Sequence, residues 1–165
     1  MLFRSGDALA VCLLKKRGFS EQDFLIFHPS GALGKGFTYK VADLMLTDTD
    51  KLPIAQETAP FADVIKLISE KKLGMAMIIN KEGVLTGVLT DGDIRRTLIK
   101  YQNIGSLLAK DVMSINPKNI SPKDYGASAL NLMEKFSITA LAVVDENKKP
   151  TGVIHIHDLL KAGVA

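Results

Sequence analysis

The stretch DVIKLISEKKLGMAMIIN at residues 63–80 decides the fold, because residues 128–145, SALNLMEKFSITALAVVD, match it without a gap. The match continues at the same offset of 65 residues through TGVL at 86–89 and TGVI at 151–154. A repeat of this kind fixes the architecture, since each copy must form the same supersecondary unit. The chain is therefore built from two similar units.

The similarity also extends upstream, at a different offset. VADLM at residues 41–45 matches AKDVM at residues 109–113, which lies 68 positions later, so the first copy carries three extra residues between Met45 and Ile54. An insertion of this length is accommodated in a loop without changing the elements on either side. Each repeat thus opens well before its first strand.

Both copies predict the order strand, helix, strand, strand, helix. A short extended piece precedes Gln56 or Ser121, and closing helices begin near Asp91 or His157. Two strands joined by a polar turn form a hairpin. The helices carry apolar residues at helical spacing, and the strands are short apolar runs. The helix positions are Phe61, Val64, Ile65 and Ile68, then Ala129, Leu132, Met133 and Phe136, and the strands are 75–79, 84–89, 140–144 and 151–156.

The size of one repeat implies how the two pack. A unit of about 55 residues with one sheet face to cover is only marginally stable alone. Two copies are expected to pack sheet to sheet as a single α+β body, with equivalent clefts on either side of their interface.

Composition and charge narrow the functional classes. The 165 residues are 47% hydrophobic and 24% charged, which is typical of a globular domain. The net charge of +3 comes from short scattered basic clusters, which do not indicate a nucleic-acid-binding stripe. No apolar run approaches the roughly 18 residues of a spanning helix. The single Cys12 leaves no internal disulfide, and we expect a cytoplasmic protein.

The repeats resemble a known family. The segments VADLM at 41–45, AKDVM at 109–113 and GVLTDGDIRR at 87–96 are similar to the opening and closing motifs of CBS domains. The resemblance implies a tandem CBS pair, a ligand-sensing module, with one domain at residues 38–102 and the other at 103–165.

The first 37 residues carry a second resemblance. GDALAV at 6–11, RGF at 17–19 and HPSGALGK at 28–35 are similar to the end of the sugar isomerase domain of D-arabinose 5-phosphate isomerases, which carry a CBS pair directly after it. Ser30 departs from the glycine that is usual there. The resemblance implies that residues 1–37 are a remnant of that domain and that His28 serves proton transfer in the full enzyme. Since the phosphate-binding loop of that domain has no counterpart here, we expect this chain alone to be inactive.

Thr90 and Asp93 are the most specific candidates for a ligand site. In CBS domains that bind nucleotides, the matching hydroxyl and carboxylate hold phosphate and ribose. An ionised carboxylate accepts two hydroxyl donors, which suits a vicinal diol. The same pair also matches a capping box that opens the last helix of the repeat. Both roles are compatible, because a helix N-terminus retains free amides for a phosphate.

Four further residues are candidates for the same regulatory ligand. Arg95 and Arg96 follow on the closing helix and could complement a phosphate or a carboxylate; solvent exposure is the alternative for each. In the second repeat His155 stands where the first has Thr90, and Asp158 stands where it has Asp93, so the two sites are unequal. His155 and His157 are too few ligands to predict a metal site. The sequence predicts no metal and no cofactor.

The preferred function is regulatory. The resemblance implies that the pair senses a nucleotide or nucleotide sugar, such as CMP-Kdo, and tunes an enzyme that interconverts ribulose 5-phosphate and arabinose 5-phosphate in lipopolysaccharide biosynthesis. Two alternatives stay open: a structural CBS pair that holds subunits together, and a free-standing adenine-nucleotide sensor. We expect a homo-oligomer, because CBS pairs commonly dock through their closing helices and the helix at 8–14 is apolar all round.

Overall fold

The computed structural model describes residues 13, 15–16 and 38–164. Leu13, Lys15 and Lys16 are helical, and Leu13 lies within the helix expected at 8–14. The other predictions for residues 1–37, including Cys12 and the candidate catalytic His28, lie outside the described residues. No helix in the described part of the chain is long and apolar enough to cross a membrane.

The first repeat has the predicted order of elements. It opens with the short helix α4 and a single turn, η1, before the strands begin. The three extra residues of this repeat are accounted for by η1, which leaves the following strand in place. The elements are α4 (Val41–Leu44), η1 (Thr49–Lys51), β1 (Ile54–Gln56), α5 (Phe61–Lys71), β2 (Met75–Ile79), β3 (Leu85–Thr90) and α6 (Asp91–Lys100).

The second repeat follows the same order, with one additional short strand. Its elements are α7 (Ala109–Val112), β4 (Ser114–Ile115), β5 (Asn119–Ile120), α8 (Gly126–Phe136), β6 (Ala140–Val144), β7 (Pro150–His155) and α9 (Ile156–Lys161). The central strands β2 and β6 have the predicted bounds. The predicted hairpins are confirmed, since β2 pairs antiparallel with β3 and β6 pairs antiparallel with β7.

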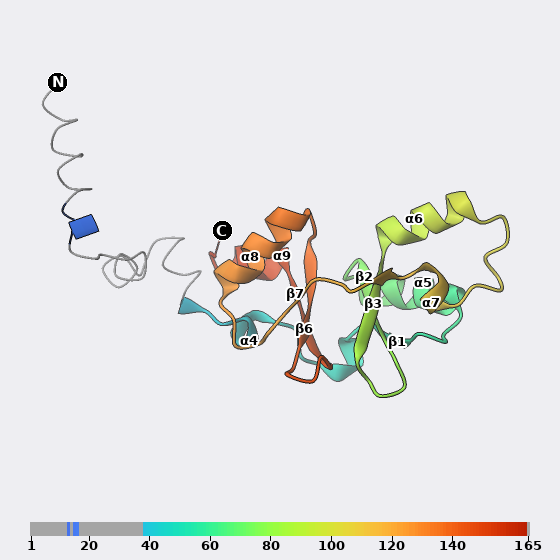
Figure 1. The fold of residues 1–165 in the computed structure, drawn as a ribbon, viewed down its shortest axis with the longest axis horizontal. Helices are drawn as coiled ribbons and strands as arrows, with labels where there is room; N and C mark the ends of the chain where they lie inside the picture. The colour runs from blue at the N-terminus through green and yellow to red at the C-terminus, as the bar shows by residue number, and fades with distance from the viewer. Residues whose placement is uncertain (1–12, 14, 17–37, 165) are drawn as a thin grey trace, which may run out of the picture.

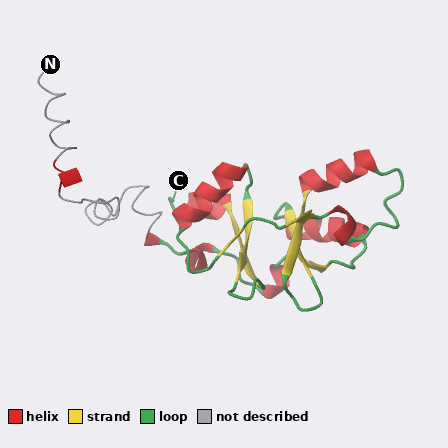
Figure 2. Cartoon of the chain, viewed as in Figure 1, coloured by secondary structure: helices red, strands yellow, loops and turns green. Residues whose placement is uncertain are grey.

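Two sheets face each other across the middle of the molecule, with helices on their outer sides (Figure 2). Strand alternation explains the three core clusters. In β2, Met75 and Met77 pack with Ala142 and Val144 of β6 between the sheets. The alternate residues of each strand pack against the helices of their own half. Both faces of each central strand are therefore buried, which confirms packing of sheet on sheet.

The two repeats exchange their opening segments. Strand β4 comes from the second repeat but completes the first sheet, pairing antiparallel with β3. Conversely, Leu46 pairs with Val153 of β7, and Val41 belongs to the core of the second half. Figure 1 shows the same exchange, with α4 beside α8 and α7 beside α5. The sequence repeats thus differ from the packing units by these opening segments.

Two glycines at matching positions allow the exchange. A Cβ placed on Gly87 would lie 2.4 Å from Sδ of Met113, and one on Gly152 would lie 2.8 Å from the carbonyl oxygen of Leu46. In each case the neighbour belongs to the opening segment of the other repeat. Close approach of that segment requires a residue without a side chain.

One predicted core residue is wrong. Phe136 has the spacing of the apolar face of α8, but its side chain is 39% exposed. The helix ends at Phe136, and Ser137 follows with φ of 52° in the left-handed region. The ring therefore lies beyond the last buried turn, where Lys118 and Lys135 stack on it at 4.6 and 5.6 Å from its centroid.

Candidate functional site

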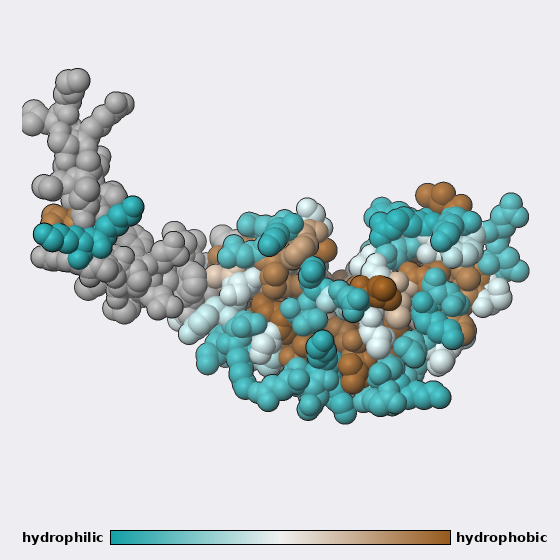
Figure 3. Space-filling view, viewed as in Figure 1, coloured by the Kyte–Doolittle hydropathy of each residue, from teal (hydrophilic) through white to brown (hydrophobic). Residues whose placement is uncertain are grey.

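A cavity of about 590 Å³ lies where the two halves meet, at the start of α6. This volume is in the usual range for small-molecule sites. Its walls come from the end of β3 and the first turns of α6, from residues 114–118, and from residues 136–140 of the second repeat. The surface is hollowed between the two halves on the face shown in Figure 3, with apolar side chains inside and charged ones around them. The cavity combines an apolar interior with a polar end.

Asp93 stands at the polar end and is saturated with hydrogen bonds. The amide and hydroxyl of Thr90 donate to its Oδ2 at 2.9 and 2.7 Å. Arg96 Nη2 and Ser114 Oγ donate to its Oδ1 at 2.6 and 3.1 Å. The hydroxyl of Thr90 also accepts from the Asp93 amide at 3.2 Å, which completes the predicted capping box.

This environment keeps Asp93 ionised. The residue is only 6% exposed. Burial raises the pKa of its carboxyl, but the hydrogen bonds from Thr90, Arg96 and Ser114 lower it by more, so the pKa lies below the ordinary value of 3.8. Donors that contact the charged form favour that form. A negative charge is therefore held at the base of the cavity.

The cavity is lined by three cationic side chains and two carboxylates, those of Asp91 and Asp93. Arg95, Arg96 and Lys118 all line it. Arg96 is the partner of Asp93 and its side chain is 71% exposed. Arg95 makes no ion pair with any residue that the structure describes. The site thus offers more cationic than anionic groups to a ligand.

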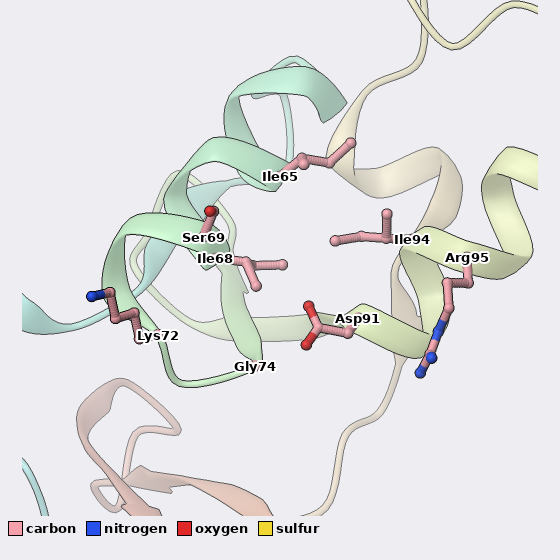
Figure 4. Close-up of a pocket in the computed structure, with 8 residues that line it drawn as sticks. All are labelled: Ile65, Ile68, Ser69, Lys72, Gly74, Asp91, Ile94 and Arg95. Carbon is pink, nitrogen blue, oxygen red and sulfur yellow. The ribbon is translucent and has the colours of Figure 1, made fainter.

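A second hollow of about 630 Å³ adjoins the first, between α5 and α6. Ile65 and Ile68 on α5 face Ile94 on α6 across it, while Lys72 points away (Figure 4). The two hollows share Gly74, Asp91 and Arg95. Arg95 therefore stands on the ridge between them.

The equivalent position in the second repeat is built differently. His155 caps α9 by accepting a hydrogen bond from the His157 amide on its Nδ1, at 3.2 Å, so the proton of the neutral ring lies on Nε2. Burial and the neighbouring His157 lower the pKa of His155 below 6.5, against an opposing effect of Asp158. The carboxylate of Asp158 accepts only one hydrogen bond among the described residues, from the His155 amide at 3.3 Å.

His155 and His157 lie close together, with ring centroids 4.8 Å apart. His155 is the N-cap of α9 and His157 lies in its first turn. In the described residues there is no group of three or more potential metal ligands.

Four of the sequence-predicted site residues line a single cavity, and two lie elsewhere. Thr90, Asp93, Arg95 and Arg96 line the cavity at the start of α6. His155 and Asp158 are at the start of α9. Sequence reasoning missed Ser114, Lys118 and Phe136. The residue that matches Ser114 in the first repeat is the apolar Leu46. Comparison of the repeats therefore did not indicate Ser114 as a hydrogen-bond donor.

Comparison with known sequences identifies relatives. A sequence profile described as CBS domain matches residues 41–100 and 109–165. Arabinose 5-phosphate isomerase KdsD of Escherichia coli K12 is 41% identical over 159 residues, which cover 96% of this chain and 48% of that protein. The chain thus spans about half the length of the curated relatives it matches. The resemblance to D-arabinose 5-phosphate isomerases is confirmed.

Comparison with solved structures supports the fold. CBSX2 in complex with AMP has a TM-score of 0.65 and 23% identity, covering 76% of this chain and 96% of that one. The CBS domain pair of protein MJ0100, in complex with 5′-methylthioadenosine and S-adenosyl-L-methionine, has a TM-score of 0.65 and 20% identity, covering 74% and 94%. At this identity the comparison establishes the shared architecture.

Proposed function

Because the chain belongs to the CBS domain family and matches arabinose 5-phosphate isomerases, we propose that it is the regulatory, ligand-binding part of such an isomerase. The observation that carries this proposal is the cationic cavity of about 590 Å³ at the start of α6. A carboxylate that is almost fully buried, paired with Arg96 and placed against a cavity is typical of a functional site.

The proposed enzyme interconverts ribulose 5-phosphate and arabinose 5-phosphate, a step toward lipopolysaccharide. This proposal is supported by the 41% identity to arabinose 5-phosphate isomerase KdsD over 96% of this chain. Among the residues of this chain, His28 is the one candidate for its proton transfer. We propose that the chain alone does not convert either sugar phosphate. A histidine that transfers protons, His28, does not form an active site without a loop that binds the substrate phosphate. Turnover by purified protein, lost in His28→Ala, would contradict this.

The proposed ligand is a nucleotide or nucleotide sugar, for example CMP-Kdo. The cavity has apolar walls for a base, a carboxylate for hydroxyl groups at Asp93, and cations for phosphate or carboxylate at Arg95 and Arg96. Thr90 contributes its hydroxyl beside the first amides of α6. These features together match a molecule that is flat at one end and anionic at the other.

The first repeat is the better site for an anion. At the offset of 65 residues, Leu160 replaces Arg95 and Lys161 replaces Arg96. His155 replaces Thr90 and its lowered pKa keeps it neutral near pH 7. The start of α9 therefore presents less positive charge, and we assign His155 and Asp158 to a weaker or neutral-ligand site.

Calorimetric titration tests the sensor. We expect at least one of CMP-Kdo, CMP, AMP and ATP to bind, and Asp93→Asn to weaken that binding by about tenfold to a hundredfold, as for loss of a hydrogen bond to a charged group worth roughly 1.5–3 kcal/mol. Asp158→Asn is the matched control, with a smaller effect. If no compound binds at millimolar concentration, the structural pair becomes the better explanation.

We also propose self-association through the closing helices. Leu98 and Ile99 on α6 are 52% and 87% exposed, and Leu160 on α9 is 49% exposed. Exposed apolar side chains on one helix favour burial in an interface. Sedimentation equilibrium should show an oligomer at micromolar concentration that Ile99→Lys weakens. A parent protein that sediments as a monomer would refute the assignment.

A further inference from the structure

The carboxylate of Asp93 has no vacant acceptor position. A carboxylate accepts about four hydrogen bonds, two on each oxygen. Thr90 supplies two donors to Oδ2, and Arg96 and Ser114 supply one each to Oδ1. A ligand hydroxyl can therefore reach this carboxylate only by displacing a donor that already occupies it.

Of the two donors to Oδ1, Arg96 and the exposed Ser114, Arg96 is the one on a long flexible side chain that can swing away from the carboxylate. The Thr90 amide is fixed by the backbone of the cap, and the Thr90 hydroxyl is part of the same capping box. The Arg96 side chain is 71% exposed and reaches Asp93 from the following turn of the same helix. A long exposed side chain exchanges partners at low cost, because water and ligand compete for it.

The guanidinium of Arg96 also covers the start of α6. A Cβ placed on Gly92 would lie 3.3 Å from Nη1 and 3.6 Å from Nη2 of Arg96, and 3.5 Å from the Thr90 hydroxyl. The arginine thus lies over the helix N-terminus, where an anion would bind. It occupies the hydroxyl position and the anion position of the same site.

We propose that Arg96 is an internal latch that makes the cavity select anionic ligands over neutral ones. The proposal rests on the proposed function of this cavity as a nucleotide sensor. A ligand that carries both a diol and a phosphate replaces Arg96 on Asp93 and gives the released guanidinium a new anionic partner. A neutral nucleoside offers only the diol, so it separates the ion pair without compensation.

The second repeat lacks this device. Lys161 stands in the place of Arg96, and Asp158 has no ion pair with any described residue. Lysine is a point charge without the planar fork that lets arginine span two acceptors. Selection against neutral ligands is therefore confined to the first repeat.

The test compares Arg96→Gln with the parent, using CMP, cytidine, AMP and adenosine as probes. Arg95→Gln is the matched control, since Arg95 lines the same cavity but does not contact Asp93. Binding is followed by 15N NMR at the amides of Gly92 and Ser114, which separates this cavity from the start of α9. Arg96→Gln removes one donor from Asp93. The substituted side chain is itself exposed, so the substitution leaves the packing of the core unchanged.

We expect the parent to prefer each nucleotide over its nucleoside by about tenfold or more, as one charge-assisted hydrogen bond allows. Arg96→Gln should bind nucleotides more weakly and nucleosides about twofold to fivefold more tightly than the parent does. Arg95→Gln should weaken nucleotide binding with no gain for nucleosides. The gain is the decisive result, because loss of a simple phosphate ligand cannot produce it.

Three results would overturn the latch. If the parent binds nucleotide and nucleoside alike, or if Arg96→Gln gains no nucleoside affinity, Arg96 is at most a phosphate ligand and the sensor itself stands. If none of the four compounds shifts the Gly92 or Ser114 amides in any variant, both the latch and the nucleotide sensor fail.

Discussion

Removing the Asp93 carboxylate should destabilise the protein more than removing its counterpart Asp158. In Asp93→Ala, Thr90 loses both of its bonds to Oδ2, and Arg96 and Ser114 lose their shared acceptor. Hydrogen bonds to a charged group contribute roughly 1.5–3 kcal/mol. The ion pair with the exposed Arg96 adds only about 0.2–1 kcal/mol because water screens it. Because water can solvate the exposed Arg96 and Ser114 in the variant, the expected loss is about 2–4 kcal/mol, which corresponds to roughly one charged hydrogen bond together with the ion pair.

Asp158→Ala removes a single bond of 3.3 Å to the His155 amide, and the expected loss is about 0.5–1 kcal/mol. Asp93→Asn separates charge from hydrogen bonding. Its amide oxygen can keep both Thr90 donors and its NH₂ can donate to the Ser114 hydroxyl, so only the Arg96 pair is lost. That variant should lose about 1 kcal/mol or less.

Urea unfolding followed by circular dichroism gives the free energy of unfolding of all three variants. An unchanged m-value, the slope of that free energy against urea concentration, shows that the variants differ in stability alone. The order of losses should be Asp93→Ala, then Asp93→Asn and Asp158→Ala together. Equal losses for the two alanine variants would refute the reasoning, because the contacts of Asp93 would then contribute nothing beyond an ordinary cap.

Three further predictions follow from the same structure. The stability difference between the parent and Asp93→Asn should be constant above about pH 5 and shrink as the pH falls below 3.8, since the folded-state pKa of Asp93 is lowered; a difference that is independent of pH in acid unfolding curves would contradict this. The pKa of His155 is lowered from 6.5, so the unfolded state binds the proton first, and parent stability should fall below pH 6.5 more than that of His155→Asn. Parallel curves in thermal melts from pH 7.5 to 5 would rule this out. Gly87→Ala and Gly152→Ala should each lose about 1–3 kcal/mol by overpacking, with Gly152→Ala worse because a backbone carbonyl blocks it, and urea curves matching the parent would disprove the close approach.

The repeat made the local elements predictable. Two apolar runs at matching positions, 75–79 and 140–144, predicted the central strands with the bounds that the structure has. Short runs bounded by Asn80 and Asp145 leave little choice of element or register. The capping box at Thr90 and Asp93 was predictable for the same reason, because its partners are three residues apart.

Long-range partners were not predictable. Ser114 reaches Asp93 only because β4 crosses into the first sheet, and its counterpart Leu46 gives no hint of a donor. Phe136 shares the spacing of the core face, yet the helix ends at that residue and leaves the ring at the cavity. Helical periodicity fixes a direction around the axis but not where the packed partner stops.

The exchanged opening segments determine how far the effect of one ligand extends. A molecule bound in the cavity as proposed would contact the start of α6, the segment around Ser114 and the segment around Thr139, which belong to both repeats. The two sheets are linked through these segments, because β4 completes the first sheet and Leu46 pairs with the second. Binding to the folded state adds about 2.7 kcal/mol at a ligand concentration of a hundred times Kd. If the proposed ligand binds, we expect that stabilisation to act on the pair as a whole, so that occupancy of a single site in the first repeat also stabilises the second.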